Sequence, residues 1–278
     1  MIVDTHVHAI ADDRAKYPKV PDAYDWPSLT DTALLGTMDR LGIDRATLVQ
    51  PYFTYHYDNT YQVDCARAHP DRFAVVCVID IADPKAPETL TRLVECYGVH
   101  GVRMFPGRRK GLLDDPKTFP VWEKAIALGI PITVACNLDE LHKMPSVVAN
   151  FPKAKAICFE HMWGVKFANA TFPETKLITA LARFPNAYLK LCPNNSYALR
   201  EADGTPKGFY GALIEAFGAR RIMWGSNYPA HWDHYGKIED RLPLMQEDLS
   251  FLPAAEREAF FGGTALTVWP SLAARTTL

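Results

Sequence analysis

Short apolar runs alternate with longer amphipathic runs along the whole chain. The apolar runs are rich in Val, Ile, Leu or Ala, and most of them lack the polar–apolar alternation of a half-exposed strand. This pattern is typical of parallel strands that are buried on both faces. It predicts strands over 1–7, 45–50, 73–81, 100–105, 131–136, 156–160, 187–191 and 221–225.

The segments between these runs carry their apolar residues on one face and predict helices. The clearest is 30–41, where Thr30 or Asp31 can cap the start and Gly42 the end. Further helices are predicted over 61–68, 86–97, 119–128, 138–150, 174–184, 208–217, 238–249 and 254–260.

Strands that alternate with helices require right-handed crossovers and a parallel sheet. Eight such units in a chain of 278 residues suit a barrel, which typically takes about 250 residues. We therefore predict the α/β class and a (β/α)8 TIM barrel, with room for distortion, formed by one domain over 1–278. Long loops over 9–28 and 193–206 follow the first and seventh strands, on the face where barrel active sites lie.

Composition restricts the partners. Thirty basic residues face 32 acidic ones, so the net charge of −2 gives no field to attract nucleic acid or an anionic membrane. We find no signal peptide, no run of about 20 apolar residues and no CxxC pair among the six cysteines. We expect reduced thiols, a cytoplasmic protein, and a small-molecule substrate without nucleic acid or membrane partners.

The strongest chemical signal is Asp4-Thr5-His6-Val7-His8 at the end of the first strand. Side chains two residues apart in a strand point to the same side, so His6 and His8 project together into the barrel mouth. Neutral imidazoles in that position can share a divalent metal or polarise a carbonyl. The alternative is a pair of structural histidines at a strand end, but the position at the end of the first strand favours function.

This motif resembles the first strand of the amidohydrolase superfamily. Residues 160–164 resemble its strand-six histidine motif, 101–105 the strand-four arginine motif of the lactonase branch, and 223–229 the eighth-strand motif. Weaker similarities lie at 41–45, 49–50, 58–59 and 187–191. The likeness runs from residue 2 to about residue 270. It points to the group of 2-pyrone-4,6-dicarboxylate lactonase and sugar lactonases, and it implies a hydrolase that can form a homodimer.

Two departures from the family pattern bear on the chemistry. Asn227 occupies the position where the superfamily normally has Asp, and an amide cannot act as a base. The fifth strand lacks the usual histidine, while Arg103 in the fourth strand disfavours a nearby divalent cation. We favour a metal-free site, with one weakly held Zn²⁺ on His6, His8 and His161 as the alternative.

The predicted reaction is hydrolysis of a lactone or related cyclic ester that carries a carboxylate. His6, His8 and His161 would stabilise the oxyanion, and Arg103 would bind the anionic group unless it forms a buried ion pair instead. Because Asn227 cannot take a proton, His161 or His231 is the expected base. The catalytic set is therefore His6, His8, Arg103, His161 and Asn227. The predicted substrate-binding residues are Tyr52, Tyr55, His56, Arg108, Arg109, Trp163, Tyr197 and His231.

Two other functions stay open. The first is a non-hydrolytic reaction on the same scaffold, such as decarboxylation, hydration or lactone isomerisation, which would tolerate Asn227. The second is a ligand-binding relative that has lost activity, against which the retained His6, His8, Arg103 and His161 argue.

Overall fold

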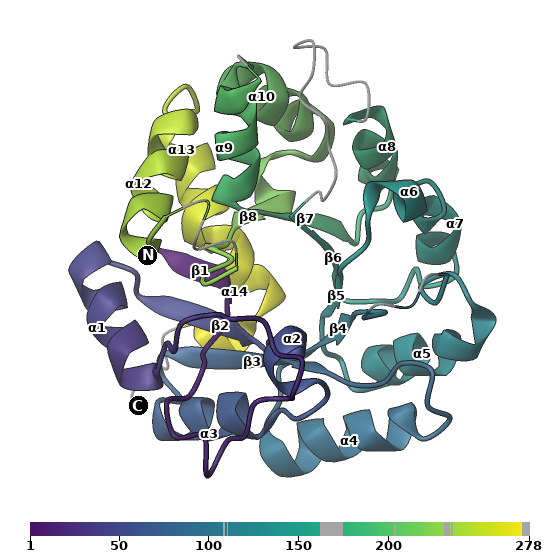
Figure 1. Ribbon diagram of the computed structural model, residues 1–278. Helices are drawn as coiled ribbons and strands as arrows, with labels where there is room; N and C mark the ends of the chain where they lie inside the picture. The colour runs from purple at the N-terminus through teal and green to yellow at the C-terminus, as the bar shows by residue number, and fades with distance from the viewer. Residues whose placement is uncertain are drawn as a thin grey trace, which may run out of the picture.

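Eight parallel strands surround a central axis with helices outside them in the computed structural model, which describes residues 1–107, 109, 111–161, 175–202, 204–230, 234 and 236–273 (Figure 1). The strands are β1 (Val3–Val7), β2 (Arg45–Val49), β3 (Phe73–Val78), β4 (Gly101–Met104), β5 (Ile132–Val134), β6 (Ile157–Glu160), β7 (Ala187–Leu191) and β8 (Ile222–Trp224). Each strand pairs with the next in sequence order. All the predicted strands are confirmed, most of them one to three residues shorter than predicted.

The sheet closes between its last and first strands. The backbone N–H of Asn227 donates to the carbonyl of His6 (2.7 Å), and that of His8 donates to the carbonyl of Tyr228 (2.8 Å). Gly225 permits this approach, because a Cβ atom there would lie 2.7 Å from the Cβ of His6. The fold is therefore the predicted (β/α)8 barrel.

Helices cover the outside of the barrel, as Figure 1 shows. Thr30 caps the first of them by accepting from Ala33 N (3.2 Å), and Gly42 ends it with a φ of 69°, as predicted. The α-helices are α1 (Asp31–Leu41), α2 (Tyr52–Tyr55), α3 (Thr60–Ala68), α4 (Ala86–Tyr97), α5 (Phe119–Ala127), α6 (Leu138–Leu141), α7 (Met144–Ala149), α8 (Thr175–Thr179), α9 (Pro193–Glu201), α10 (Pro206–Phe217), α12 (Ile238–Asp248), α13 (Ala254–Glu258) and α14 (Thr264–Val268).

Several boundaries differ from the prediction. The predicted loop 193–206 contains α9, which begins directly after β7 because Pro193 presets the φ of a first helical residue. The predicted helix 138–150 is broken into α6 and α7, with a proline in the first turn of α7. The last helix does not end at 260, since a π-helical segment, Ala259–Gly263, joins α13 to α14. The four residues of α2 are too few to show a helical period.

The lower end of the barrel is apolar. Small or medium side chains at the beginnings of the strands, such as Val3, Ala74 and Cys158, pack in one cluster with Trp269 and Val268 from the C-terminal segment. Accordingly, α14 lies behind the strands in Figure 1. This packing leaves the opposite end, where the strands finish, for polar side chains.

Two predictions from composition can be compared with the structure. All six cysteines are free thiols, as predicted, and only Cys96 is exposed. None of the helices in the described part of the chain is long and apolar enough to cross a lipid bilayer.

Candidate active site

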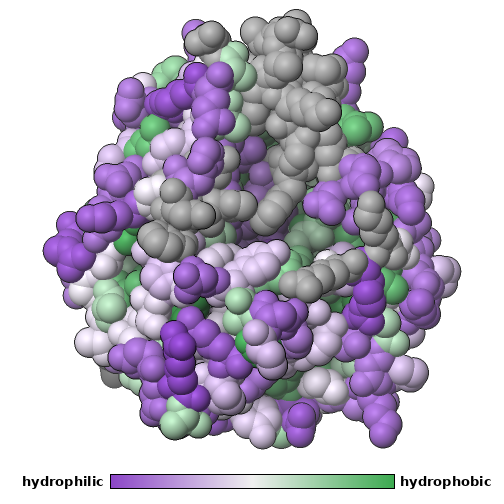
Figure 2. Space-filling view, in the orientation of Figure 1, coloured by the Kyte–Doolittle hydropathy of each residue, from purple (hydrophilic) through white to green (hydrophobic). Residues whose placement is uncertain are grey.

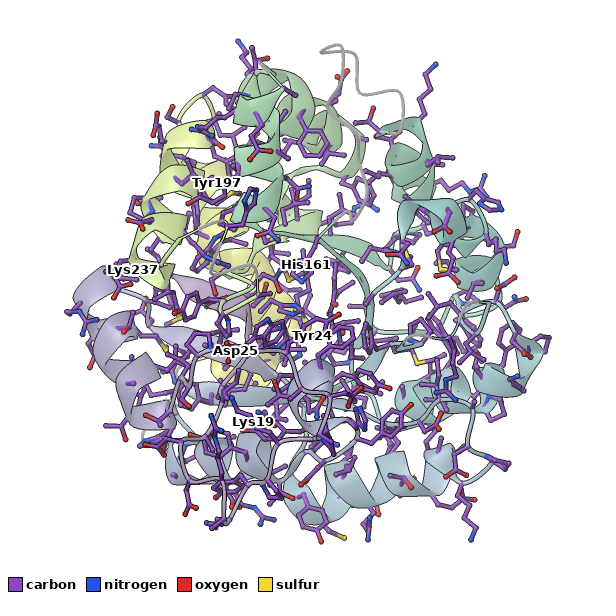
Figure 3. The ribbon with its side chains drawn as sticks, in the orientation of Figure 1. Lys19, Tyr24, Asp25, His161, Tyr197 and Lys237 are labelled. Carbon is purple, nitrogen blue, oxygen red and sulfur yellow. The ribbon has the colours of Figure 1, made fainter. Side chains whose placement is uncertain are left out.

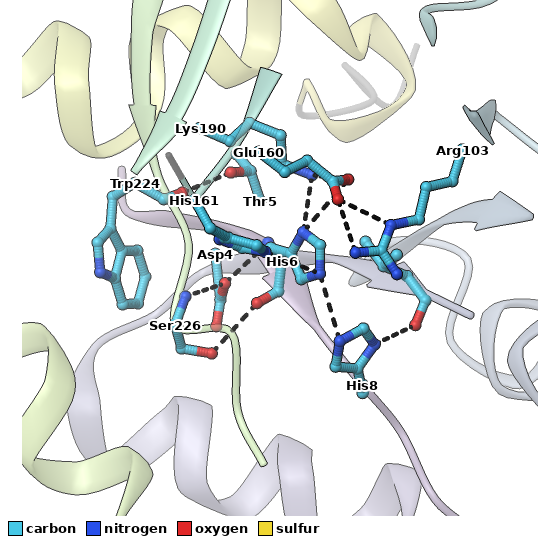
Figure 4. A network of polar contacts seen from close by, with 11 residues as sticks. Asp4, Thr5, His6, His8, Arg103, Glu160, His161, Lys190, Trp224 and Ser226 are labelled. Atoms are coloured by element: carbon cyan, nitrogen blue, oxygen red, sulfur yellow. Dashed lines mark hydrogen bonds and ion pairs between the residues drawn. The ribbon is translucent and has the colours of Figure 1, made fainter. Parts of the chain in front are cut away.

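A β-bulge in β1 helps to place the paired histidines. The pairing of β1 with β2 shifts register between Asp4 and Val7, which re-aims the side chains between them. His6 and His8 are both buried, and their Nε2 atoms lie 3.3 Å apart (Figure 4). The structure therefore brings the two imidazoles together at the end of β1, and their catalytic role stays a prediction.

A third imidazole joins them from β6. His161 follows the last residue of that strand with a φ of 59°, and its Nε2 lies 3.3 Å from the Nε2 of His6. The labelled His161 lies near the middle of the barrel in the view of Figure 3. His8 and His161 thus both lie against His6, which brings the three histidines of the predicted catalytic set together.

Two buried cations and one carboxylate lie against His6, and we call these three residues, Arg103, Lys190 and Glu160, the charged belt. The Nε and Nη2 of Arg103 both lie 2.7 Å from Oε2 of Glu160. The Nζ of Lys190, in β7, lies 3.7 Å from Oε1 of Glu160 and 3.2 Å from Nδ1 of His6 (Figure 4). Arg103 therefore forms the buried ion pair considered above, and its anion-binding role stays a prediction.

Burial and nearby positive charges keep His6 and His8 neutral. Burial lowers the pKa of His6 well below its ordinary range, and the charges of His161 and Lys190 lower it further. The pKa of His8 falls to about 3 because of burial and the charge of Arg103. His8 Nδ1 donates to the carbonyl of Val49 (2.7 Å), so the lone pair of a neutral His8 lies on Nε2, facing His6.

Asp4 holds the backbone of this arrangement in place through hydrogen bonds. Its Oδ1 accepts from the backbone N–H of His6 (3.0 Å) and of Ser226 (2.8 Å), which ties β1 to the segment after β8. Burial raises the pKa of Asp4 to about 6. Its position therefore indicates support for His6 and not contact with a substrate.

Asn227 presents a buried donor. It is 1% exposed, has a φ of 54°, and its Nδ2 has no hydrogen-bond partner among the described residues. The segment that carries it is held by Arg241 of α12, which donates to the carbonyls of Ser226 (2.9 Å) and Ala230 (3.0 Å). An unsatisfied N–H₂ group in a fixed position is suited to a ligand oxygen.

Several predicted substrate-binding residues lie further out, around a cavity of about 350 Å³ that we call the outer rim. Its lining is Asp22, Tyr52, Phe53, His56, Tyr57 and Arg109. Arg109 contacts Oδ1 of Asp80 at 2.6 Å and donates to the hydroxyl of Tyr57 at 2.8 Å. On this face, hydrophilic side chains gather over the outer helices, and paler and apolar ones lie nearer the centre (Figure 2).

The other predicted contacts are distributed differently. Tyr55 is 4% exposed, and its hydroxyl accepts from Ala11 N (2.9 Å), so it holds the loop after β1. Trp26 from that loop stacks on His8 with ring centroids 5.4 Å apart. Tyr197 lies half-buried on α9 and is labelled in Figure 3. Arg108, Trp163 and His231 lie outside the described residues.

Sequence reasoning missed Glu160 and Lys190 as site residues. A signal existed for both, because each is a charged residue within a short apolar run that was predicted to be a buried strand. Charged side chains are almost never fully buried without a partner. Two such residues at inward-facing positions of neighbouring strands therefore predict an ion pair in the barrel.

One group in the described part of the chain could hold a metal ion. Donor atoms of His6, Glu160 and His161 all lie within 4.8 Å of one another. The group differs from the predicted trio by containing Glu160 in place of His8. Arg103 already contacts one oxygen of that carboxylate twice.

Residues 3–270 match the family model described as Amidohydrolase. The L-fucono-1,5-lactonase of Burkholderia ambifaria is 25% identical over 264 residues, which cover 88% of this chain and 89% of that protein. This match agrees with the predicted resemblance to sugar lactonases.

Solved structures share the barrel. A probable 2-pyrone-4,6-dicarboxylic acid hydrolase from Acinetobacter baumannii, with citric acid bound, has a TM-score of 0.76 at 15% identity and covers 97% of this chain and 99% of its own. An amidohydrolase from Burkholderia multivorans with bound zinc has a TM-score of 0.77 at 20% identity, with the same coverage. A dihydroxybenzoic acid decarboxylase from Polaromonas sp. JS666, with manganese and 2-nitroresorcinol, has a TM-score of 0.70 at 17% identity and covers 98% of both chains.

Proposed function

The chain belongs to the amidohydrolase family, and from this premise we propose that it opens a lactone or related cyclic ester bearing a carboxylate, by attack of water. The observation that carries the proposal is the convergence of three imidazoles beside a charged belt in which two cations share one carboxylate. The lactonase activity of the Burkholderia ambifaria relative supports the reaction type. A small molecule is the only partner required; the homodimer and the cytoplasmic location stay predictions.

The charge balance of the belt supports an anionic substrate. Arg103 and Lys190 share the single carboxylate of the belt, Glu160, and the charge of Asp4 acts on Lys190 from further away. One unit charge about 6 Å from a carboxylate contributes about 3 kcal/mol at an effective dielectric constant of about 20. The citric acid bound to the Acinetobacter baumannii protein suits the same interpretation.

His6 suits the carbonyl of the substrate, and His8 suits the orientation of His6. Both are neutral at pH 7. The single N–H of neutral His8 donates to the carbonyl of Val49, so of the two residues only His6 offers an N–H that polarises a carbonyl and stabilises the oxyanion that forms. Because their rings are fixed by neighbours, little reorganisation is needed during the reaction.

Proton abstraction falls to another group. Asn227 cannot accept the proton of the attacking water, so we assign this role to His161, whose Nε2 lies 3.3 Å from that of His6. When the ring C–O bond breaks, the protonated His161 returns the proton to the leaving ring oxygen. The buried N–H₂ of Asn227 instead donates to an oxygen of the substrate. This assignment gives Asn227 a role that aspartate could not perform.

We further propose that the working site holds no metal. The donor set argues against a divalent cation, because Arg103 and Lys190 lie against Glu160 and an amide replaces the eighth-strand carboxylate. Zinc on His6, His8 and His161 remains the alternative, and the zinc bound to the Burkholderia multivorans neighbour supports this alternative. No step of the reaction above depends on a metal.

The mass of the product tests the reaction type. The purified protein is incubated with a panel of sugar lactones and carboxylate-bearing cyclic esters, and the products are weighed by mass spectrometry. We expect a gain of one water molecule, with an oxygen that comes from labelled solvent. A product of unchanged mass, or one that has lost CO₂, would remove hydrolysis from the account.

Decarboxylation is the second candidate, and Asn227 is the observation that favours it. A reaction that needs no base for water tolerates an amide at this position. The Polaromonas decarboxylase shows that the same fold performs such chemistry. Dihydroxybenzoates added to the panel above test this candidate through the release of CO₂.

Asn227→Asp separates an active site from a decayed one. We expect a loss of activity, because the variant replaces a buried donor, which has no partner among the described residues, with a carboxylate that cannot donate when it is ionised. A large gain of lactonase activity would instead indicate that the natural chain has lost its function.

A further inference from the structure

The buried amino group of Lys190 transfers no proton in the reaction above, and its position is costly. The side chain is fully buried, and an ammonium taken out of water costs several kcal/mol unless it is well paired. Arg103 already makes two 2.7 Å contacts to Oε2 of Glu160, and Lys190 lies 3.7 Å from Oε1, beyond hydrogen-bond distance. The ring of Trp269, 5.4 Å away, offers only part of the compensation.

The closest polar atom to Lys190 is Nδ1 of His6, at 3.2 Å. Burial lowers the pKa of Lys190, whereas the charge of Glu160 favours its ammonium form. As an ammonium it can only donate, which leaves Nδ1 bare and puts the proton of a neutral His6 on Nε2. The competing arrangement, in which Nδ1–H donates to Oε1 of Glu160, is longer at 3.5 Å. The geometry therefore favours the tautomer that carries its proton on Nε2.

With this tautomer, each hydrogen bond from Lys190 through His6 to His8 has a defined donor and acceptor. Lys190 donates to Nδ1 of His6, and Nε2–H of His6 points at Nε2 of His8, 3.3 Å away. That atom of His8 is bare, because its Nδ1 donates to the carbonyl of Val49. A substrate oxygen that enters between the rings meets the N–H of His6, whereas a metal ion would meet a nitrogen that already carries a proton.

Resting on the metal-free function proposed above, we infer that Lys190 is a positioning residue that holds the proton of His6 on Nε2. It thereby makes His6 a hydrogen-bond donor to the substrate instead of a metal ligand. Without Lys190, Nδ1–H of His6 would turn to Glu160, which is the carboxylate–histidine arrangement that metal-binding histidines adopt.

Nitrogen NMR of ¹⁵N-histidine in the full-length, unliganded protein tests the inference. His6→Gln assigns the His6 signals. We expect a protonated Nε2 in the natural protein and in Lys190→Arg, which keeps a donor, and a proton shifted to Nδ1 in Lys190→Met. A proton on Nδ1 in the natural protein overturns the inference, even if the methionine variant fails to fold.

Zinc titration calorimetry and kinetics supply the second readout. Lys190→Met should bind zinc about tenfold more tightly or better, and its kcat should fall while KM changes little. Its melting temperature should not fall, because Arg103 and Glu160 remain as a neutral pair. Equal zinc affinity in the two proteins contradicts the inference.

The two proposals fail separately. A wrong tautomer in a protein that hydrolyses lactones refutes only the role of Lys190. The expected tautomer in a protein without lactonase activity refutes only the proposed function.

Discussion

The charged belt and the outer rim lie at the same end of the barrel but are built differently. In the belt, Arg103, Glu160 and Lys190 are almost completely buried, and each contact joins one strand to another. On the rim, Arg109 is 43% exposed and pairs with Asp80, which is 34% exposed. Strands therefore position the belt, whereas loops and the short α2 position most of the rim.

This difference indicates a division of labour. Charges in a buried site interact strongly and need no reorganisation, so the belt and the imidazoles beside it suit the chemical step. Charges on the rim are screened by water and salt, so they suit selection of the substrate. The account predicts that substitutions in the two regions change different constants.

The largest effect is expected for the third imidazole. His161→Ala should lower kcat by about 10²–10⁴-fold, because it removes the group that takes the proton from water. Steady-state kinetics on the true substrate measure this loss. His69→Ala, at the opposite end of the barrel before β3, is the matched control and should leave kcat unchanged. Near-natural turnover of the His161 variant would exclude this residue from the mechanism.

The second effect concerns stability. Glu160→Gln leaves Arg103 and Lys190 buried without a carboxylate, which should lower the free energy of unfolding by about 3–5 kcal/mol. Asp115→Asn removes a half-exposed partner of Lys117 at 2.8 Å and should cost much less, because water screens this pair. Urea unfolding measures the free energy of unfolding of both variants. Equal losses in the two variants would contradict a stabilising role for the buried ion pairs of the belt.

The third effect is a dependence of stability on pH. Unfolded His8 binds a proton near its ordinary pKa of 6.5, but the folded residue does so only near 3. In this window the unfolded state binds more protons, so the free energy of unfolding falls as the pH falls from 6.5 towards 3.

His8→Gln tests this directly. The variant should show a shallower fall of melting temperature between pH 6.5 and 4 than the natural protein. Asp4, whose pKa is raised to about 6, contributes with the opposite sign in part of this range, but it is present in both proteins. Identical slopes would show that His8 titrates normally in the folded state.

The smallest effect is expected on the rim. Arg109→Ala should raise KM by less than about tenfold and leave kcat nearly unchanged, since exposed ion pairs contribute at most about 1 kcal/mol. Arg72→Ala, which breaks a pair with Asp39 away from the mouth, should change neither constant. A large fall of kcat in the Arg109 variant would contradict the claim that substitutions in the belt and on the rim change different constants.

The sequence predicted the parts of the molecule that depend on local pattern. The strands were found because continuous apolar runs are enough to specify buried parallel strands, and His6 and His8 because a period of two fixes their common side. The sequence did not predict the bulge in β1, the helix break at Pro145 or the π-helical segment Ala259–Gly263, because packing decides these features. The pairing of Arg103 with Glu160 was not predicted either, because it joins residues that are 57 positions apart in the sequence and meet only when the barrel forms.

The most direct test of the account is hydrolysis of a carboxylate-bearing lactone in labelled water by protein from which metals have been removed by a chelator. The account predicts an unchanged rate and one solvent oxygen in the product, because neutral imidazoles and the charged belt perform the reaction. Loss of activity after chelation, with recovery on addition of zinc, would contradict it.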